Sequence, residues 1–166
     1  MIVADFRKII LLIFALFISI TSFAQIQKKV FKCTLGTTTY NQVERILENN
    51  YKNPSFDGSR TYLELENVEY GGYVWHTVTF NFHNKVLYSV TLEGSNFATR
   101  QDFSGLEFDL SNRYSQYRTS EGYDDGTVVI KTSFFENPQH NYKSAYVKYE
   151  YKPFTKQKQK ENESAW

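Results

Sequence analysis

The chain has 166 residues, of which 17% are aromatic and 22% are charged, and its 19 basic and 18 acidic side chains give a formal net charge of +1. This near-neutral balance excludes the strong positive footprint that a nucleic-acid-binding domain presents to phosphates. The single cysteine excludes an internal disulfide.

Residues 1–24 have the parts of a secretory signal peptide. Two basic residues precede an apolar run over 9–20, and small residues stand at Ser22 and Ala24. Signal peptidase accepts small side chains at these two places, and a run of about a dozen residues is shorter than the roughly 20 that span a bilayer. We therefore expect cleavage after Ala24, export to the periplasm or the extracellular space, and no stable membrane span afterwards. An uncleaved N-terminal anchor is the alternative.

Residues 25–152 are predicted to form one α+β domain, because this length suits a single hydrophobic core. Residues 153–166 are predicted to form a flexible polar tail, in which Lys alternates with Gln and Thr. Cys33 precedes the first predicted helix. We expect it to be buried beside that helix, and the alternative is an exposed thiol that cross-links two chains.

A helix is predicted over residues 39–50. Thr39 and Gln42 fit a capping box, in which the Thr hydroxyl and the Gln amide satisfy backbone N–H groups at the helix start. Apolar residues then recur every three or four positions, which gives the helix one face to bury. These residues are Tyr40, Val43, Ile46, Leu47 and Tyr51.

Three strands are predicted next, because polar and apolar residues alternate in RTYLELENVEY, YVWHTVTFNFH and KVLYSVTLEG. In the first strand, Leu63 and Leu65 point away from the face that carries Tyr62, Glu64 and Glu66. In the second, strict alternation gives two opposite sets of residues: Tyr73, Trp75, Thr77, Thr79 and Asn81 on one face, and Val74, His76, Val78, Phe80 and Phe82 on the other. The turn HNK places Asn84 where a positive φ is tolerated.

A second helix follows in TRQDFSGLEFDLSNRYSQYR, and two more strands follow in GTVVIKTSFFEN and SAYVKYEYK. The helix has an apolar stripe at steps of three or four residues: Phe103, Leu106, Leu110, Tyr114 and Tyr117. The predicted order is therefore α-β-β-β-α-β-β, an antiparallel meander sheet in two layers with both helices on one face. The opposite face of the sheet is expected to stay open.

The helix entry LGTTTYNQVERIL, together with the meander and the second helix with its strands, resembles the β-lactamase-inhibitor-protein-like fold and the related outer-membrane assembly lipoproteins. The motif covers residues 35–47. The resemblance implies helices against one sheet face, a remaining surface that binds proteins, and no enzymatic activity. The chain lacks the lipidation Cys of the lipoproteins and the paired cysteines of the inhibitor, so no partner and no functional residue carries over.

The histidines and carboxylates do not form a motif for catalysis or for metal or cofactor binding. No HExxH, CxxC or His-x-His spacing occurs, and His76 and His83 lie on opposite faces of one predicted strand. His140 stands in a predicted loop. Glu64 and Glu66 form a pair of carboxylates on the open face, which keeps a small hydrolase among the alternatives. The sequence thus predicts no catalytic, cofactor or metal residue and does not favour an enzyme.

The open face of the predicted sheet carries four large aromatic residues, and these are the candidate binding residues: Tyr62, Tyr73, Trp75 and Tyr146. Large amphipathic rings dominate many contact sites. We therefore expect an exported, non-enzymatic binding domain whose partner is an envelope or extracellular protein. Two alternatives stay open: a carbohydrate-binding module that uses the same rings, and cross-strand aromatic pairs that only stabilise the sheet.

Overall fold

The structure is a computed structural model, and it describes residues 25–51, 54–56, 58–95, 100–137 and 142–164. The predicted signal peptide over 1–24 and His140 lie outside the described residues. In chain order the elements are β1 (Lys29–Val30), β2 (Cys33–Thr34), α2 (Tyr40–Asn50), β3 (Ser55–Phe56), β4 (Tyr62–Tyr70), β5 (Tyr73–His83), β6 (Val86–Ser95), α3 (Arg100–Tyr114), the 3-10 helix η1 (Ser115–Tyr117), β7 (Arg118–Thr119), β8 (Gly122–Asp124), β9 (Val128–Asn137), β10 (Tyr142–Tyr151) and α4 (Lys152–Ser164).

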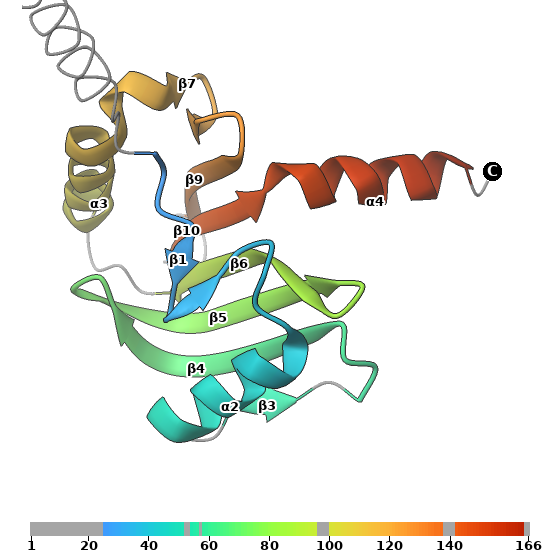
Figure 1. Ribbon diagram of the computed structural model, residues 1–166. Coiled ribbons are helices and arrows are strands. Elements are labelled where there is room, and N and C mark those ends of the chain that lie inside the picture. Colours follow the sequence, from blue (N-terminus) through green and yellow to red (C-terminus); the bar gives the residue numbers. More distant parts are fainter. Residues whose placement is uncertain (1–24, 52–53, 57, 96–99, 138–141, 165–166) are drawn as a thin grey trace, which may run out of the picture.

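An eight-stranded sheet lies at the centre of the fold (Figure 1), with the strand order β3-β4-β5-β6-β10-β9-β8-β7. Every strand pair in it is antiparallel. The predicted α+β class with an antiparallel sheet is confirmed. The seven longer predicted elements are present, whereas β1, β2, β3, β7, β8 and α4 are additional to the prediction.

The predicted start of the first helix is confirmed in α2. The Oε1 atom of Gln42 accepts a hydrogen bond from the backbone N–H of Thr39 at 2.9 Å, which is the return half of a capping box. Three residues of the predicted stripe, Tyr40, Val43 and Leu47, are buried. Helix α2 therefore packs on the core through the face that its sequence period marks.

Strands β4 and β5 change the face that they bury part-way along. In β5, Val78, Phe80 and Phe82 are buried at steps of two, but the next buried residue toward the start of the strand is Trp75, three positions before Val78. This odd step breaks the alternation. The partner strand shows the same change, because Leu63, Leu65 and then Val68 are buried. Pairing runs on both sides of Asn67, which adopts a left-handed backbone conformation with a φ of 51°. Such a residue rotates the chain within the strand, so the side chains beyond it exchange faces.

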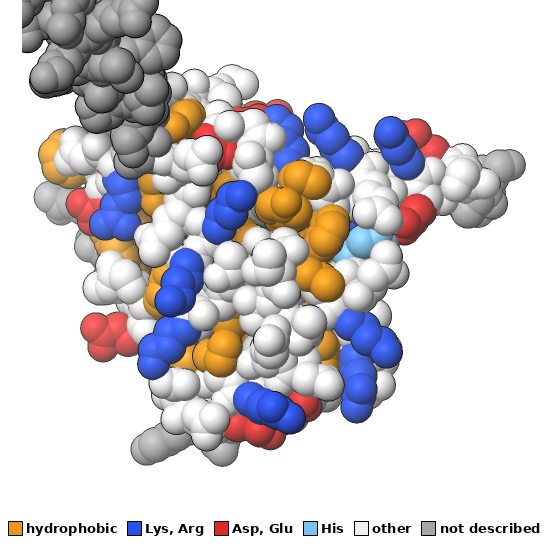
Figure 2. Space-filling model, in the orientation of Figure 1, with side chains coloured by type: hydrophobic (Ala, Val, Ile, Leu, Met, Phe, Trp, Pro, Cys, Tyr) orange, Lys and Arg blue, Asp and Glu red, His pale blue; other side chains and the backbone are white. Residues whose placement is uncertain are grey.

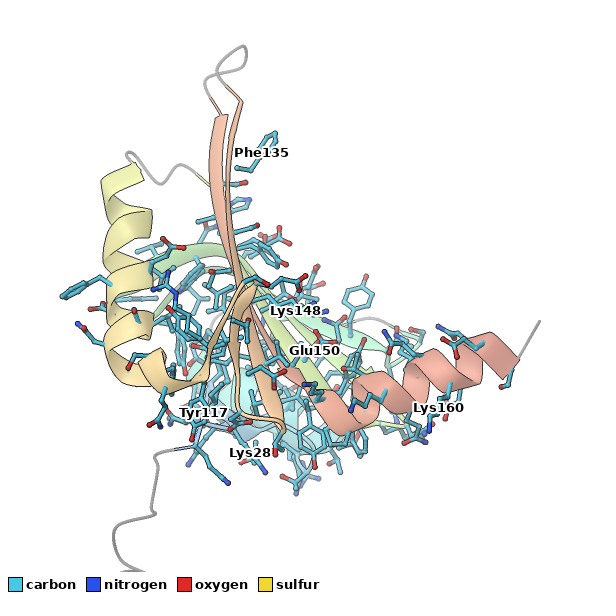
Figure 3. All side chains as sticks on the ribbon, turned by 90° about the horizontal axis from the view of Figure 1, so that it is seen from above. Lys28, Tyr117, Phe135, Lys148, Glu150 and Lys160 are labelled. Atoms are coloured by element: carbon cyan, nitrogen blue, oxygen red, sulfur yellow. The ribbon has the colours of Figure 1, made fainter. Side chains whose placement is uncertain are left out.

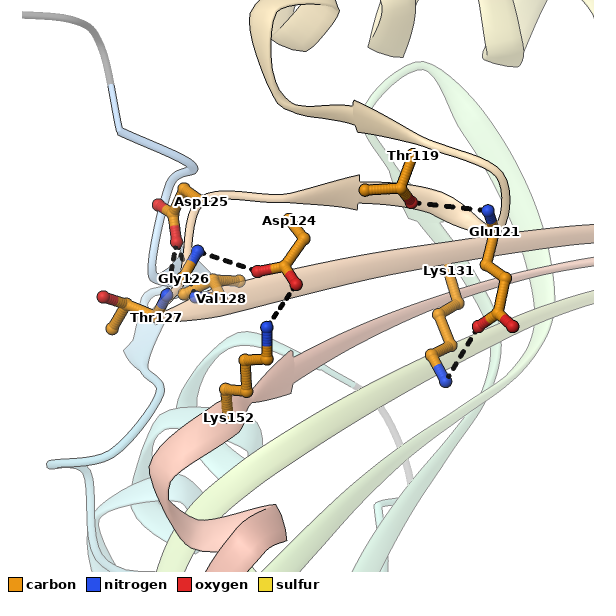
Figure 4. Close-up of polar contacts among 9 residues, drawn as sticks. All are labelled: Thr119, Glu121, Asp124, Asp125, Gly126, Thr127, Val128, Lys131 and Lys152. Atoms are coloured by element: carbon orange, nitrogen blue, oxygen red, sulfur yellow. Dashed lines mark hydrogen bonds and ion pairs between the residues drawn. The ribbon is translucent and has the colours of Figure 1, made fainter.

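Two tight turns have the backbone that their sequences favour. Asn84 and Lys85 join β5 to β6 with φ values of 50° and 63°, as in a type I′ hairpin, and the predicted positive φ at Asn84 is confirmed. Figure 4 shows the turn before β9, where Asp125 Oδ1 accepts backbone hydrogen bonds from Thr127 and Val128. Asp125 also accepts a hydrogen bond from the N–H of Ile26 at 2.9 Å, which ties the N-terminal segment to the sheet.

The C-terminal segment is polar and mostly exposed, and helix α4 occupies most of the tail predicted over 153–166, a helix that the sequence patterns do not predict. Lys, Gln and Glu favour helices, and proline is tolerated in a first helical turn. Contacts with the sheet fix the helix: Thr155 donates to Glu150 at 2.7 Å, and Glu161 lies 3.3 Å from His83. Figure 1 shows α4 extending away from the sheet.

Cys33 is fully buried in β2, as predicted, and its thiol is free. Burial raises its pKa to about 12, although the nearby charge of Lys29 acts in the opposite direction. The thiol therefore stays protonated at neutral pH. Among the helices that the structure describes, none is long and apolar enough to cross a membrane.

Candidate functional site

The four aromatic residues that were predicted to share an open face are divided between two faces of the sheet. Trp75 is only 2% exposed, and its indole N–H donates to the backbone carbonyl of Tyr70 at 3.0 Å. The hydroxyl of Tyr73 donates to Asp109 of α3 at 3.1 Å. The predicted placement of Tyr73 and Trp75 on the open face is wrong, because the change of face at Asn67 turns both side chains toward α3.

The other two candidates, Tyr62 and Tyr146, belong to the opposite surface, which we call the polar face. Its central row crosses five paired strands: Glu64, Thr79, Thr91, Lys148 and Lys131. Figure 3 shows the β9–β10 hairpin edge-on, with Lys148 and Glu150 on the side away from α3.

Tyr62 and Tyr146 do not form one platform on the polar face. Tyr62 is in register with Asn81 of β5, whereas Tyr146 is in register with Glu93 of β6. The two residues are thus three strands and four strand positions apart, which corresponds to roughly 19 Å at standard sheet spacings. Polar side chains of the central row lie between them, so the structure does not bring these rings together.

Tyr73 and Trp75, in contrast, lie side by side, with ring centroids 6.2 Å apart. Both line a cavity of approximately 720 Å³, which we call the α3 cavity. Its lining comes from α3, from the sheet and from the segment that leads into β1. The lining residues are Gln27, Lys29, Tyr70, Gly71, Tyr73, Trp75, Leu92, Leu106, Asp109, Leu110, Asn112, Arg113, Tyr114, Val147 and Tyr149.

The α3 cavity has a buried apolar floor and an exposed polar rim. Its apolar lining includes Trp75, Leu92 and Val147 of the sheet, each at most 2% exposed, and Leu110 of α3. The rim carries exposed polar side chains: Gln27, Lys29, Asp109, Asn112 and Arg113. This division is typical of small-molecule sites, in which apolar surface binds the body of a ligand and a few polar groups fix its orientation.

Helix α3 supplies both parts of this lining through its spacing. Leu106, Leu110 and Tyr114 recur at intervals of four and form the buried stripe. Asp109 and Arg113 stand one residue before Leu110 and Tyr114, so they flank the stripe at its exposed edge. The stripe is the sequence signal that predicts the floor.

Three tyrosines bring their hydroxyl groups close enough to influence one another. Burial is the main cause that raises the pKa of Tyr70 and of Tyr149, and the neighbouring Tyr114 raises both further. The positive charge of Arg113 acts on both groups in the opposite direction. The phenols of Tyr70 and Tyr149 are therefore neutral hydrogen-bond donors near neutral pH, and Arg113 lies within electrostatic range of both.

Among the rim side chains that the structure describes, positive charge outweighs negative charge, because Lys29 and Arg113 face one carboxylate, that of Asp109. That carboxylate already accepts a hydrogen bond from Tyr73. Neither Lys29 nor Arg113 forms an ion pair with a carboxylate in the part of the chain that the structure describes. Figure 2 shows Lys and Arg side chains gathered on the surface over β1 and the adjoining edge of α3.

The residues that kept a hydrolase among the alternatives are placed apart from this cavity. Glu64 accepts a hydrogen bond from Thr79 at 3.2 Å, and Glu66 and His76 are exposed. His83 contacts Glu161 of α4. No cluster of three or more metal-ligating side chains occurs within the described ranges.

Comparison with known proteins found no family model, no curated protein and no solved structure that matches this chain. The function therefore rests on the geometry of the site itself.

Proposed function

We propose that the chain is an exported, non-enzymatic binding domain and that the α3 cavity is its binding site. The observation that carries this proposal is the combination of about 720 Å³ of space, an apolar floor that includes Trp75, and a polar rim on one helix and one N-terminal segment. Tyr73 and Trp75 thus keep the binding role that the sequence predicts, but at a different face of the sheet.

The proposal includes a two-layer arrangement in which α2 and α3 cover the same face of the sheet. Side chains of both helices belong to one continuous cluster of buried hydrophobic residues, which supports this arrangement. It also agrees with the resemblance to β-lactamase-inhibitor-protein-like domains, which we retain as a hypothesis about fold and non-enzymatic character.

Export is the second part of the proposal. Ile26, two residues after the proposed cleavage point at Ala24, is 1% exposed and already belongs to the core. Cleavage there would leave every described core residue in the mature chain. N-terminal sequencing of the protein recovered from the periplasm or the medium should start at Gln25, and a protein that stays uncleaved in the membrane fraction would contradict export.

A cavity-filling variant tests the binding site. Leu110→Trp adds an indole ring to the apolar floor, whereas Phe108→Trp adds the same ring to the exposed side of α3, where Phe108 is 65% exposed. Calorimetric titration with a set of small amphipathic molecules should give saturable binding to the wild-type protein and to Phe108→Trp, and weakened or lost binding to Leu110→Trp. Equal binding to all three proteins would place the site elsewhere.

Two other binding functions have an observation in their favour. Carbohydrate binding is favoured by the neighbouring rings of Tyr73 and Trp75 beside polar rim groups. Saturable binding of an oligosaccharide by the wild type and by Phe108→Trp, but not by Leu110→Trp, would support it. Contact with an envelope or extracellular protein is favoured by Tyr62 and Phe135, which are 40% and 55% exposed on the polar face. Loss of a partner on Tyr62→Ala, with the cavity intact, would support that function.

A further inference from the structure

The rim of the α3 cavity is chemically asymmetric, and this asymmetry indicates which ligands it accepts. Arg113 and Lys29 are exposed cations without an ion-pair partner among the described residues, whereas the one rim carboxylate, that of Asp109, is engaged by the Tyr73 hydroxyl. Two cations against one carboxylate leave the described rim with a net positive charge, so an anionic ligand group that enters beside Arg113 and Lys29 is attracted to it.

Hydrogen-bond donors reinforce this preference inside the cavity. The Tyr70 and Tyr149 phenols line it, and both are protonated near neutral pH, as tyrosines ordinarily are. Burial raises the pKa of both still further. A protonated phenol can donate one hydrogen bond, and such bonds are stronger when the acceptor is charged. Arg113, Tyr70 and Tyr149 all line this cavity and the Arg113 charge acts on both hydroxyls, so the cation and the two donors favour an anionic group in the same cavity.

The apolar floor of the cavity determines which body the ligand must have. Trp75, Leu92, Leu110 and Val147 present apolar surface with no charged group among them, and burial of apolar surface is favourable in proportion to its area. The fully buried floor does not suit a ligand that is polar throughout, because the polar groups of that ligand would lose their hydration without gaining partners there.

We propose that the α3 cavity binds small amphipathic acids, with the apolar body of the ligand against Trp75 and Leu110 and its anionic group beside Arg113 and the Tyr149 hydroxyl. This inference rests on the proposed function. Lys29, on the β1 side of the rim, adds a second and weaker attraction for the anionic group.

Two probes of nearly equal shape separate the charge from the apolar body: 2-naphthoate and its neutral amide, 2-naphthamide. Their dissociation constants are measured by the fluorescence of Trp75, in a Trp166→Phe background that leaves a single tryptophan. We expect the naphthoate to bind about tenfold more tightly than the amide, since partly exposed charges contribute modestly. Added salt should reduce this difference.

Three further variants assign the preference to the rim. Arg113→Gln should bring the naphthoate close to the affinity of the amide and leave amide binding unchanged, and Tyr149→Phe should weaken naphthoate binding more than amide binding. Arg118→Gln is the matched control, because Arg118 is exposed, contacts Ser111 and does not line the cavity. It should bind both probes as the wild type does.

The outcomes separate the inference from the proposed function. Equal affinity for both probes, or a charge preference that survives in Arg113→Gln, would overturn the inference while leaving the cavity as a binding site. If neither the naphthoate nor the amide binds at millimolar concentration, both the inference and the proposed function are overturned. A tenfold preference that disappears in Arg113→Gln and persists in Arg118→Gln would establish the proposed ligand class.

Discussion

The replacement Trp75→Ala tests whether the Trp75 side chain is buried, as the structure shows, or exposed on the open face of the sheet, as strict alternation predicts. The two positions differ in the free energy of unfolding that the replacement removes. The ring is 2% exposed, so nearly all of its surface is removed from water on folding. Truncation of a buried Trp to Ala reduces the free energy of unfolding by about 3–5 kcal/mol. We expect the lower end, about 3 kcal/mol, because the ring borders the α3 cavity and water can enter the space that the ring leaves.

Urea denaturation followed by circular dichroism measures this change. With a slope of about 2 kcal/mol per molar urea, a loss of about 3 kcal/mol lowers the midpoint by about 1.5 M. Val74→Ala is the control, because Val74 is the preceding residue of β5 and is 69% exposed. It should change stability by no more than about 0.5 kcal/mol. Equal effects of the two replacements, or a larger effect at Val74, would refute the change of face in β5.

Three further predictions concern other parts of the fold. Because the pKa of Cys33 is about 12 rather than 9.0, its thiol should react with a maleimide about a thousandfold more slowly in the native protein than in urea, and rapid native labelling would contradict its burial. Lys152 donates to Asp124 and lowers the pKa of that carboxyl below 3.8, so Asp124→Asn should reduce stability by at most about 1 kcal/mol at pH 7. The contribution of a lowered pKa exists above 3.8 and is lost as the pH falls through the folded-state value, so melting curves of the two proteins should converge in acid. A Cβ atom at Gly122 would lie 2.0 Å from a carbonyl oxygen of β9, at a φ of 141°, so Gly122→Ala should lower stability by about 2 kcal/mol or more in thermal unfolding. Gly58→Ala, where a Cβ meets nothing within 4 Å, should be nearly neutral.

Local sequence patterns predict those elements that are long and strictly periodic. The capping pair and the stripe of α2, the buried Val128 and Ile130 of β9, Ala145 and Val147 of β10, and Leu106, Leu110 and Tyr114 of α3 lie on the faces that their sequence periods mark. In β6 the alternation holds for Val90 and Leu92 only, because Leu87 and Ser89 are buried in place of Val86 and Tyr88, beside the register shift between Asn81 and Phe82 of β5. These faces are predictable because the period of a helix or strand decides which residues share a face, and a buried face needs apolar residues at that spacing within a single segment.

The sequence of β4 contains a local signal for the change of face, but an assumption of strict alternation along the strand conceals it. Leu65 and Val68 are three positions apart, and the intervening Asn67 belongs to a residue type that tolerates a positive φ. Because β4 and β5 are paired, the rotation at Asn67 also repositions Trp75 in the neighbouring strand. The alternation within β5 alone assigns Trp75 to the wrong face.

The α3 cavity depends on contacts between segments that are distant in the sequence. Lys29 reaches the rim because the segment before β1 is held by the hydrogen bond from Ile26 to Asp125, almost a hundred residues away. No periodicity within one segment encodes such a contact. The polarity and the helix-favouring composition of α4 can be seen in the sequence, whereas the position of the helix depends on distant contacts such as that between Glu161 and His83.

The chemical shift of the Trp75 indole N–H tests the central claim most directly, because this group lies in the cavity wall and donates to the Tyr70 carbonyl. In the Trp166→Phe background the nitrogen–proton correlation spectrum contains one indole signal. Titration with 2-naphthoate should shift that signal progressively to saturation, and the amide signals of Tyr62 and Tyr146 should stay in place. An unchanged indole signal, accompanied by shifts on the polar face around Tyr62 and Tyr146, would contradict a binding site in the α3 cavity.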